Sequence, residues 1–556
     1  QLADDTTVFL KDVISVKYLF NCLESFENLS GLKANIGKTK FYSIGPSDIQ
    51  TSEQTRIKIE NTPIKLLGLT ITNDEDINIE DNFKPRVSAI KNILKHWSRR
   101  KLSLKGKITI INSLAISKLV YPATNLEVPN EILETLNKTF YEFLWDGKRP
   151  KIAAKTLENT ISQGGLKMPN IFLKVKAWQL SWLRRAVLEP ESKWIQTLNG
   201  IINRIDFVYL AQCRTNIDEI KFTVPNFYKQ IMKTWYNIRK IDNSDTIDIP
   251  AESLWYNKFI TIENKEAFKS SWHQKKILFV HNLLDNNGEF LSHIEICRKY
   301  NVTCNFLEML QMRMAIPLRW REKIKNLSTT TDNYPTEPKF LSSTQKRFKL
   351  FSETKSKDLY LELLNNKNHG HIPSCQAKWT EMYPSENLNW KILYTNAFKT
   401  CRGTKLQSFQ YRLLNRTIAC NHWLYNIKIK DSPNCDACQV DDDLLHFFIE
   451  CKQVKQFWKS FSIWWQRICS IPLVLTNTNI LFGVRNVAAT DKCINYLLIE
   501  AKKFINDNKL NKSNIISFYT FLCYIKNQLI LEKAICKNDG NLQSFENTFG
   551  SVFNNL

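Results

Sequence analysis

Four potential metal ligands toward the C-terminal end of the chain restrict its local fold more than any other feature. Cys435, Cys438, His446 and Cys451 follow the spacing Cys-x2-Cys-x7-His-x4-Cys. Thiolates and imidazole are the preferred ligands of structural Zn²⁺, and two Cys separated by two residues are typical of a zinc knuckle. Four protein ligands complete a tetrahedron and leave no open position for chemistry. The sequence therefore predicts a structural zinc element, whose bound ion contributes to the folding energy.

The spacing of the last two ligands also predicts a break in the local structure. On a regular α-helix His446 and Cys451 would point about 140° apart, since each residue turns by about 100°. We therefore expect a helix to begin or bend between them. The alternative is a chance spacing in a chain with 14 Cys, most of them isolated in apolar surroundings. His369 and His371 are a weaker metal candidate and are more typical of an exposed loop.

Hydrophobic periodicity predicts a mainly α chain with a small α+β part at the N-terminus. Short β-type runs and one helix near 15–29 alternate in the first 80 residues. Helical spacing dominates afterwards, as in 87–97, 104–119 and 131–145. A chain of 556 residues is too long for one core. We expect five parts: residues 1–80, 81–200, 201–430 with a Ser-, Thr- and Pro-containing linker near 326–344, 431–470 around the Cys cluster, and a helical tail over 471–556.

The charge balance favours a nucleic-acid partner. The formal net charge is +23, from 77 Lys and Arg against 54 Asp and Glu. Such an excess attracts polyanions and releases their counterions on binding. The alternative is an AT-rich genome that encodes Lys in place of neutral polar residues. The sequence contains no apolar run of about 18 residues and begins without the pattern of a signal peptide, so we expect neither a transmembrane segment nor a membrane partner.

An acidic pair near the N-terminus is a candidate site for divalent metal. Asp4 and Asp5 precede a β-type run, so a hairpin tip could direct a carboxylate toward Mg²⁺. Two such ions about 3.5–4 Å apart can activate a primer hydroxyl and stabilise leaving pyrophosphate. Successive strand residues face opposite ways, which makes one Asp the main ligand and the other a support. Taken alone, the pair is more typical of a solvated turn.

The order of several motifs resembles the reverse transcriptases of non-LTR retrotransposons, above all the long interspersed elements. Leu2-Ala3-Asp4-Asp5 is similar to their aromatic-Ala-Asp-Asp motif, with Leu2 in the aromatic position. Residues 26–40 are similar to the next family segment, and 65–71 to the primer-grip hairpin. Further similar segments are 104–107, 118–122, 143–145, 164–169 and 409–416.

This resemblance implies a partial reverse-transcriptase palm, a helical thumb and a helical C-terminal region with a zinc element. Asp4 would bind Mg²⁺ (or Mn²⁺) with Asp5 in support, and Lys38 would lie near the incoming triphosphate. Gly68 and Leu69 would touch the primer end. The alternatives are a solvated turn lysine at Lys38 and a β-bulge glycine at Gly68.

Basic residues of the implied thumb are candidates for backbone contacts with the template and primer. Arg99, Arg100, Lys105 and Lys107 would fix register without reading sequence. The alternative is a solvated helix face. The aromatic stripe after the Cys cluster is more typical of helix core than of base stacking. Further basic candidates are Arg184, Arg185, Lys346, Arg347 and Lys349.

The function implied by the resemblance is RNA-directed DNA synthesis on an RNA template from a DNA primer. The expected setting is a retrotransposon ribonucleoprotein in the cytoplasm and the nucleus. The family has a further catalytic Asp upstream, and this sequence starts three residues before Asp4. We therefore expect these 556 residues alone to bind nucleic acid without polymerising DNA. The alternative is a retrotransposon-derived, non-enzymatic nucleic-acid-binding protein, and the oligomeric state stays open.

Overall fold

The structure is a computed structural model in which helices predominate, as predicted. Strands occur in the described residues only as three two-stranded antiparallel hairpins. No helix in this part of the chain is both long and apolar enough to cross a membrane. The residues described are 6–12, 14–41, 63–72, 74–239, 248–325, 337–342, 347–469, 473–484, 488–510 and 516–556.

The N-terminal part combines a helix with a short hairpin. Helix α1 (Ile14–Ser30) occupies the stretch where the periodicity predicts one, and it is followed by the single turn η1 (Ile36–Lys38). Strands β1 (Ile64–Leu66) and β2 (Leu69–Ile71) pair with Lys65 opposite Thr70. The two residues between the strands have positive φ, 49° at Leu67 and 80° at Gly68. A two-residue turn of this kind matches the twist of a hairpin and favours glycine.

Side chains from the next helices fix the hairpin in place. The buried Asn82 accepts a hydrogen bond from the Thr70 amide at 2.9 Å and donates one to the Thr70 carbonyl at 2.8 Å. The Arg86 guanidinium donates to the Gly68 carbonyl at 2.9 Å. The predicted strands over 64–71 are therefore present and are attached to the start of the helical region.

A first hydrophobic core runs from Phe83 to Val175 and includes Tyr411 from much later in the chain. The helix predicted over 104–119 extends beyond that range: α5 continues through Pro122 to Asn125, because a proline has helical φ and its carbonyl still accepts from the Leu126 amide at 2.8 Å. The elements in this part of the chain are α2 (Glu75–Asn82), α3 (Lys84–Ser98), α4 (Leu104–Ile110), the π-helix η2 (Ile111–Ala115), α5 (Ser117–Asn125), α6 (Asn130–Trp145), α7 (Ala154–Glu158), η3 (Ile161–Gln163) and α8 (Ile171–Gln179).

A second core extends from Ala177 to Leu363. Part of the predicted linker, residues 337–342, contains strand β5, while 326–336 and 343–346 lie outside the described residues. The elements are α9 (Ser181–Leu188), α10 (Lys193–Ile202), α11 (Phe207–Leu210), α12 (Asn226–Arg239), η5 (Ile249–Ala251), β3 (Thr261–Ile262), β4 (Lys265–Glu266), α13 (Ser270–Gln274), η6 (Val280–Leu283), α14 (His293–Tyr300), α15 (Phe306–Ala315), α16 (Leu318–Lys325), β5 (Lys339–Ser342), β6 (Arg347–Leu350) and α17 (Ser356–Lys367).

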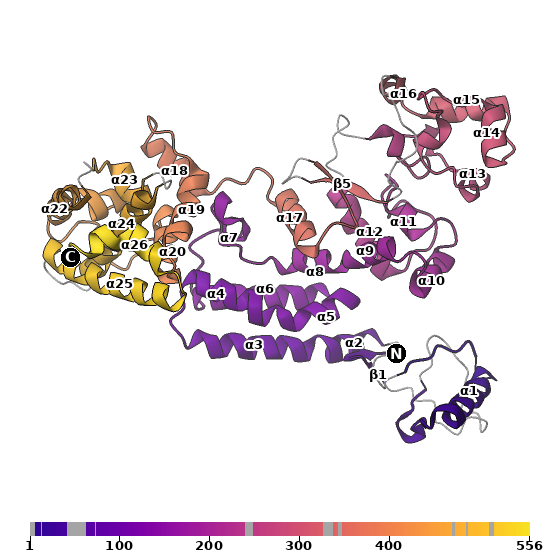
Figure 1. The fold of residues 1–556 in the computed structure, drawn as a ribbon, viewed down its shortest axis with the longest axis horizontal. Coiled ribbons are helices and arrows are strands. Elements are labelled where there is room, and N and C mark those ends of the chain that lie inside the picture. The colour runs from indigo at the N-terminus through magenta and orange to yellow at the C-terminus, as the bar shows by residue number, and fades with distance from the viewer. Residues whose placement is uncertain are drawn as a thin grey trace.

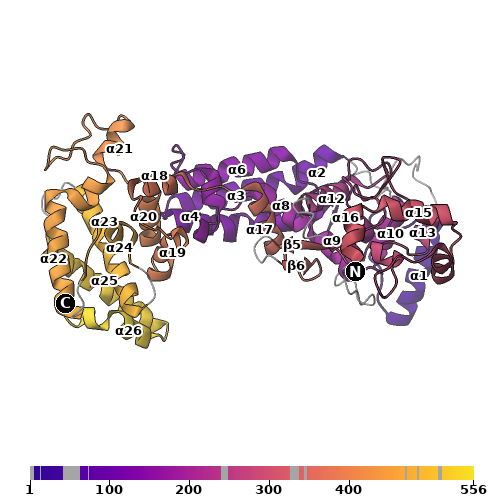
Figure 2. The same cartoon turned by 90° about the horizontal axis from the view of Figure 1, so that it is seen from above.

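A third core extends from Cys375 to Val552 and contains the Cys-rich segment. The first core lies between the other two in both views (Figures 1 and 2). Tyr411 of the third-core helix α20 donates to the Gly164 carbonyl of the first core at 3.2 Å. The elements are α18 (Ser374–Met382), α19 (Trp390–Thr400), α20 (Thr404–Leu414), α21 (Asn421–Asn426), the π-helix η8 (His446–Glu450), α22 (Lys452–Cys469), α23 (Asn477–Phe482), α24 (Ala489–Leu510), α25 (Phe518–Asn538) and α26 (Leu542–Phe553).

Candidate metal centre and nucleic-acid interface

The first two cysteines of the cluster lie in a tight loop between α21 and η8. The Cys435 amide donates to the Val440 carbonyl at 2.8 Å, and the Gln439 amide donates back to the Cys435 carbonyl at 2.8 Å. Gln439 has a positive φ of 60°, which turns the chain back on itself. Asn434 and Asp441 close the base of the loop as an antiparallel bridge. These bonds hold both thiols on the inside of one turn.

The predicted break between the last two ligands is confirmed. His446 opens the π-helix η8, and the Cys451 amide donates to the His446 carbonyl at 3.0 Å, five residues back. A π-type turn is wider than an α-turn. It brings residues 446 and 451 closer to one side of the helix than a regular α-helix would. Cys451 then leaves the helical conformation, with ψ of 133°, before α22 begins.

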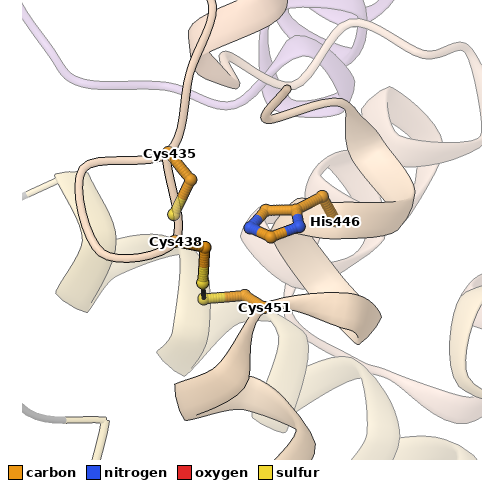
Figure 3. A group of neighbouring side chains, drawn as sticks. All are labelled: Cys435, Cys438, His446 and Cys451. Carbon is orange, nitrogen blue, oxygen red and sulfur yellow. Dashed lines mark hydrogen bonds between the residues drawn. The ribbon is translucent and has the colours of Figure 1, made fainter. Parts of the chain in front are cut away.

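The four side chains converge on one point. Their ligand atoms all lie within 4.8 Å of one another. The Sγ atoms of Cys438 and Cys451 are 3.8 Å apart, and a tetrahedron with Zn–S bonds of about 2.3 Å has edges of roughly 3.8 Å. Figure 3 shows the imidazole of His446 facing the three sulfur atoms. The geometry and the donor set therefore suit a tetrahedral Zn²⁺ ion.

One buried atom of the cluster has no protein partner. The Nε2 atom of His446 forms no hydrogen bond with any residue that the structure describes, although it is buried. A buried ring nitrogen without a partner is costly, and metal coordination would satisfy it. Two opposing effects act on the pKa of the Cys438 thiol. Burial raises its pKa, but hydrogen bonds, among them that from the Lys452 amide at 3.5 Å, outweigh this and lower it.

A charged pair beside the cluster ties it to α24. Asp442 accepts from the Asn421 amide at 3.1 Å, and one of its oxygens lies 3.9 Å from the Lys509 ammonium. The same ammonium lies 4.3 Å from the ring centroid of Phe447. Burial raises the pKa of Asp442, while Lys509 opposes the shift. These residues were not predicted, because nothing in the local sequence pairs positions 67 apart.

The aromatic stripe after the cluster is core, as the sequence favours. Phe457, Phe461 and Trp465 are at most 3% exposed and pack in the third core. The opposite side of α22 exposes Lys452, Lys455 and Lys459. The stripe therefore contributes stability rather than a base-stacking surface.

The predicted thumb cations have different environments. Arg99 and Arg100 are exposed, and the Arg100 guanidinium lies 4.4 Å from the ring centroid of Trp97. Lys105 is half-buried. Lys107 is only 4% exposed and donates to the Leu144 carbonyl at 3.2 Å and to Asp146 at 2.5 Å.

The burial of Lys107 could have been read from the sequence. It lies three residues after Leu104 and four before Ile111, on the apolar side of its helix. Its ammonium is buried and already bonded to the Leu144 carbonyl and to Asp146, so it is not accessible to a phosphate. Arg99, Arg100 and Lys105 are thus the predicted cations that remain available at the surface.

The other basic candidates differ in how far they are engaged within the protein. Arg184 donates to the Ser352 carbonyl at 3.0 Å, and Lys349 pairs with Asp358 at 3.5 Å. Arg185 is exposed, with its guanidinium over the ring of Trp182, and resembles Arg100 in this respect. Lys346 lies outside the described residues.

The structure describes only some of the residues that the resemblance assigns to polymerisation. Asp4 and Asp5 lie outside the described residues. Lys38 is exposed at the end of η1, where its amide donates to Asn35 Oδ1 at 3.2 Å. Gly68 is exposed at the hairpin tip and open to a ligand, whereas the side chain of Leu69 is buried and is not.

The weaker histidine candidate has a different partner. The His371 Nε2 atom lies 3.0 Å from the Thr156 hydroxyl, which links α17 and α18 to the first core. Within the described part of the chain, the cluster of three Cys and His446 is the one group found with converging metal-ligand atoms.

Comparison with known proteins relates the chain to a transposon. No protein-family model matches it. It is 23% identical over 267 residues to the Transposon TX1 uncharacterized 149 kDa protein of Xenopus laevis. The match covers 46% of this chain and 20% of that protein, so the chain spans about a fifth of the relative's length.

Proposed function

We propose that the chain is the C-terminal part of the RNA-directed DNA polymerase of a non-LTR retrotransposon. The observation that carries the proposal is the likeness to the Transposon TX1 protein over 267 residues. The order of the reverse-transcriptase-like motifs, the hairpin at residues 64–71 and the converging Cys and His side chains are consistent with it. The excess of 23 positive charges suits a chain that holds RNA and DNA.

In this proposal the N-terminal residues act at the site of polymerisation. Asp4 holds a catalytic Mg²⁺ (or Mn²⁺) with support from Asp5, and Lys38 lies near the incoming triphosphate. Metal ions bound there would activate the hydroxyl of the primer end and neutralise the charge on the leaving pyrophosphate. The exposed tip at Gly68 offers a backbone surface to the primer end. Full activity requires a further catalytic Asp from outside these 556 residues.

Primer extension tests the catalytic assignment. The chain joined to the coding sequence upstream of it should extend a DNA primer on an RNA template in the presence of Mg²⁺. Asp4→Asn should abolish nearly all extension, because the remaining groups cannot hold both ions. Asp12→Asn, a change at an exposed carboxylate of the described chain, is the matched control. Unchanged extension by Asp4→Asn would remove Asp4 from the mechanism.

Metal analysis tests the zinc element. The purified, reduced chain should contain about one zinc per molecule. Cys435→Ser should lose the ion, because a tetrahedral site cannot close with three strong ligands. Cys469→Ser, a half-buried thiol outside the cluster, should keep it. If elemental analysis of the reduced chain finds no zinc, the zinc assignment is wrong.

Salt titration tests nucleic-acid binding. The affinity for a single-stranded RNA or an RNA–DNA hybrid should fall more than about tenfold between roughly 50 and 200 mM salt, since phosphate contacts release counterions. Fluorescence anisotropy with a labelled oligonucleotide measures this. A flat response would show that the positive charge of the chain does not serve polyanion binding.

A further inference from the structure

Cations gather where the first core meets the third. The Lys105 amide of α4 donates to the Ser408 hydroxyl of α20 at 3.3 Å. Arg412 lies four residues further along α20, on the same side of the helix. Lys105 interacts electrostatically with Lys167, and Lys151 interacts with Arg412 and Lys148. We name this group the basic seam: Lys105, Lys148, Lys151, Lys167 and Arg412.

The carboxylates around the basic seam are occupied elsewhere. Asp146, the nearest in sequence to Lys148, pairs with the buried Lys107. Glu158 pairs with Lys367. Among the described residues, no cation of the basic seam lies within ion-pair distance of an Asp or Glu. The fold therefore brings like charges together without balancing them.

Part of this charge is also removed from water. Burial lowers the pKa of Lys105, of Lys151 and of Arg412. Lys167 lowers the pKa of Lys105 further, and Arg412 and Lys148 do the same for Lys151. Desolvated like charges destabilise the folded chain unless an anion approaches them.

The basic seam continues toward the candidate zinc element. The Lys151 ammonium lies 4.7 Å from the ring centroid of Trp423 on α21. Asn421, also on α21, donates to the Asn434 carbonyl at 2.7 Å, next to Cys435. Lys148, Lys151 and Lys167 are exposed. An anion with charges repeated along its length fits cations spread over two cores better than a small anion does.

We propose that the basic seam binds the sugar–phosphate backbone of a nucleic acid that lies along the surface from the first core to the candidate zinc element. This rests on the proposed function and assigns a surface to it. The cations contact phosphates and carry no sequence information. RNA and DNA share this chemistry, and separate probes distinguish them.

Charge-neutralising variants of the exposed residues test the proposal. The variant Lys148→Gln, Lys151→Gln, Lys167→Gln is compared with a control that removes the same charge from the second core, Arg298→Gln, Arg319→Gln, Lys325→Gln, all exposed. The probes are a single-stranded RNA, a single-stranded DNA and an RNA–DNA hybrid, each of about 20 nucleotides. Circular dichroism melting establishes that both variants fold.

The seam variant should bind at least one probe about 10–100-fold more weakly than the wild-type chain at roughly 0.1 M salt. The slope of log affinity against log salt should become shallower by about 2 to 3, the number of phosphate contacts removed. The control should stay within about threefold. The probe that loses most affinity identifies the strand that the seam holds.

Chemical footprinting gives a result that does not depend on variants. Bound nucleic acid should protect Lys148, Lys151 and Lys167 of the wild-type chain from acetylation, and should leave Lys325 reactive. If the wild type binds with steep salt dependence while the seam variant binds equally well and its lysines are unprotected, the seam proposal fails and the proposed function stands. If the wild-type chain binds none of the probes, the proposed function fails as well.

Discussion

Lys502 on α24 is a fully buried amine whose hydrogen-bond acceptors lie on two other helices. It donates to Gln410 Oε1 and to the Leu481 carbonyl, both at 2.8 Å. Both hydrogen-bond acceptors are neutral, and the electrostatic contribution of Cys401 opposes the cost of burying the charge without outweighing it. Burial lowers the pKa of Lys502 to about 7. The neutral amine still satisfies both acceptors, which explains how the third core accommodates a lysine.

This pKa predicts a pH-dependent stability. Between about pH 7 and 10 the unfolded chain holds a proton on Lys502 that the folded chain has released, so raising the pH favours the folded state. We expect Lys502 to add up to about 1.4 kcal/mol per pH unit to the free energy of unfolding in this window. Lys502→Met should lack this increment, whereas the exposed Lys526→Met should keep it. Denaturant unfolding at pH 7, 8 and 9 measures the difference; equal slopes for wild type and Lys502→Met would contradict the assignment.

At the scale of elements, short strands depend on side chains from neighbouring helices. Strands β1 and β2 have three residues each, too few to be stable alone. The two hydrogen bonds between Asn82 and Thr70 and the bond from Arg86 to Gly68 supply the missing support. In the same way, η8 and the bend at Cys451 determine whether the last two metal ligands can meet.

Removing Asn82 should release the hairpin. Asn82→Ala leaves the buried amide and carbonyl of Thr70 without partners, at about 1–3 kcal/mol for each group. Amide hydrogen exchange at Thr70 should accelerate by about ten- to a hundredfold, and the first core should keep its protection. The exposed Asn92→Ala on α3 is the control. Unchanged exchange at Thr70 would show that the hairpin is held by other contacts.

At the scale of the whole molecule, the described residues pack into three hydrophobic cores. The candidate metal ligands belong to the third core, where Cys435 and Cys451 are buried among its apolar side chains. The first and second cores are built from residues 83–175 and 177–363, apart from Tyr411. The loss of a metal ion should therefore affect the three cores unequally.

Zinc removal should destabilise the third core selectively. Chelation under reducing conditions would remove the ion that we propose three thiols and the buried His446 share, and the binding energy of a structural ion is part of the folding energy. Hydrogen exchange followed by mass spectrometry should show protection lost first in η8 and α22. Helices α3, α6 and α12 should stay protected, and added Zn²⁺ should restore the protection of η8 and α22. Equal loss in all three cores would show that they fold as one unit.

The sequence by itself determined the helical character of the chain, the four members of the Cys and His cluster and the break between His446 and Cys451. These are local properties, since periodicity and ligand spacing depend on residues within a few turns of one another. The tertiary structure decided the division into three cores, the pairing of Asp442 with Lys509 and the approach of Lys105 and Lys151 to α20. Such contacts join positions tens to hundreds of residues apart. They follow from which apolar faces pack together, and local periodicity does not specify that choice.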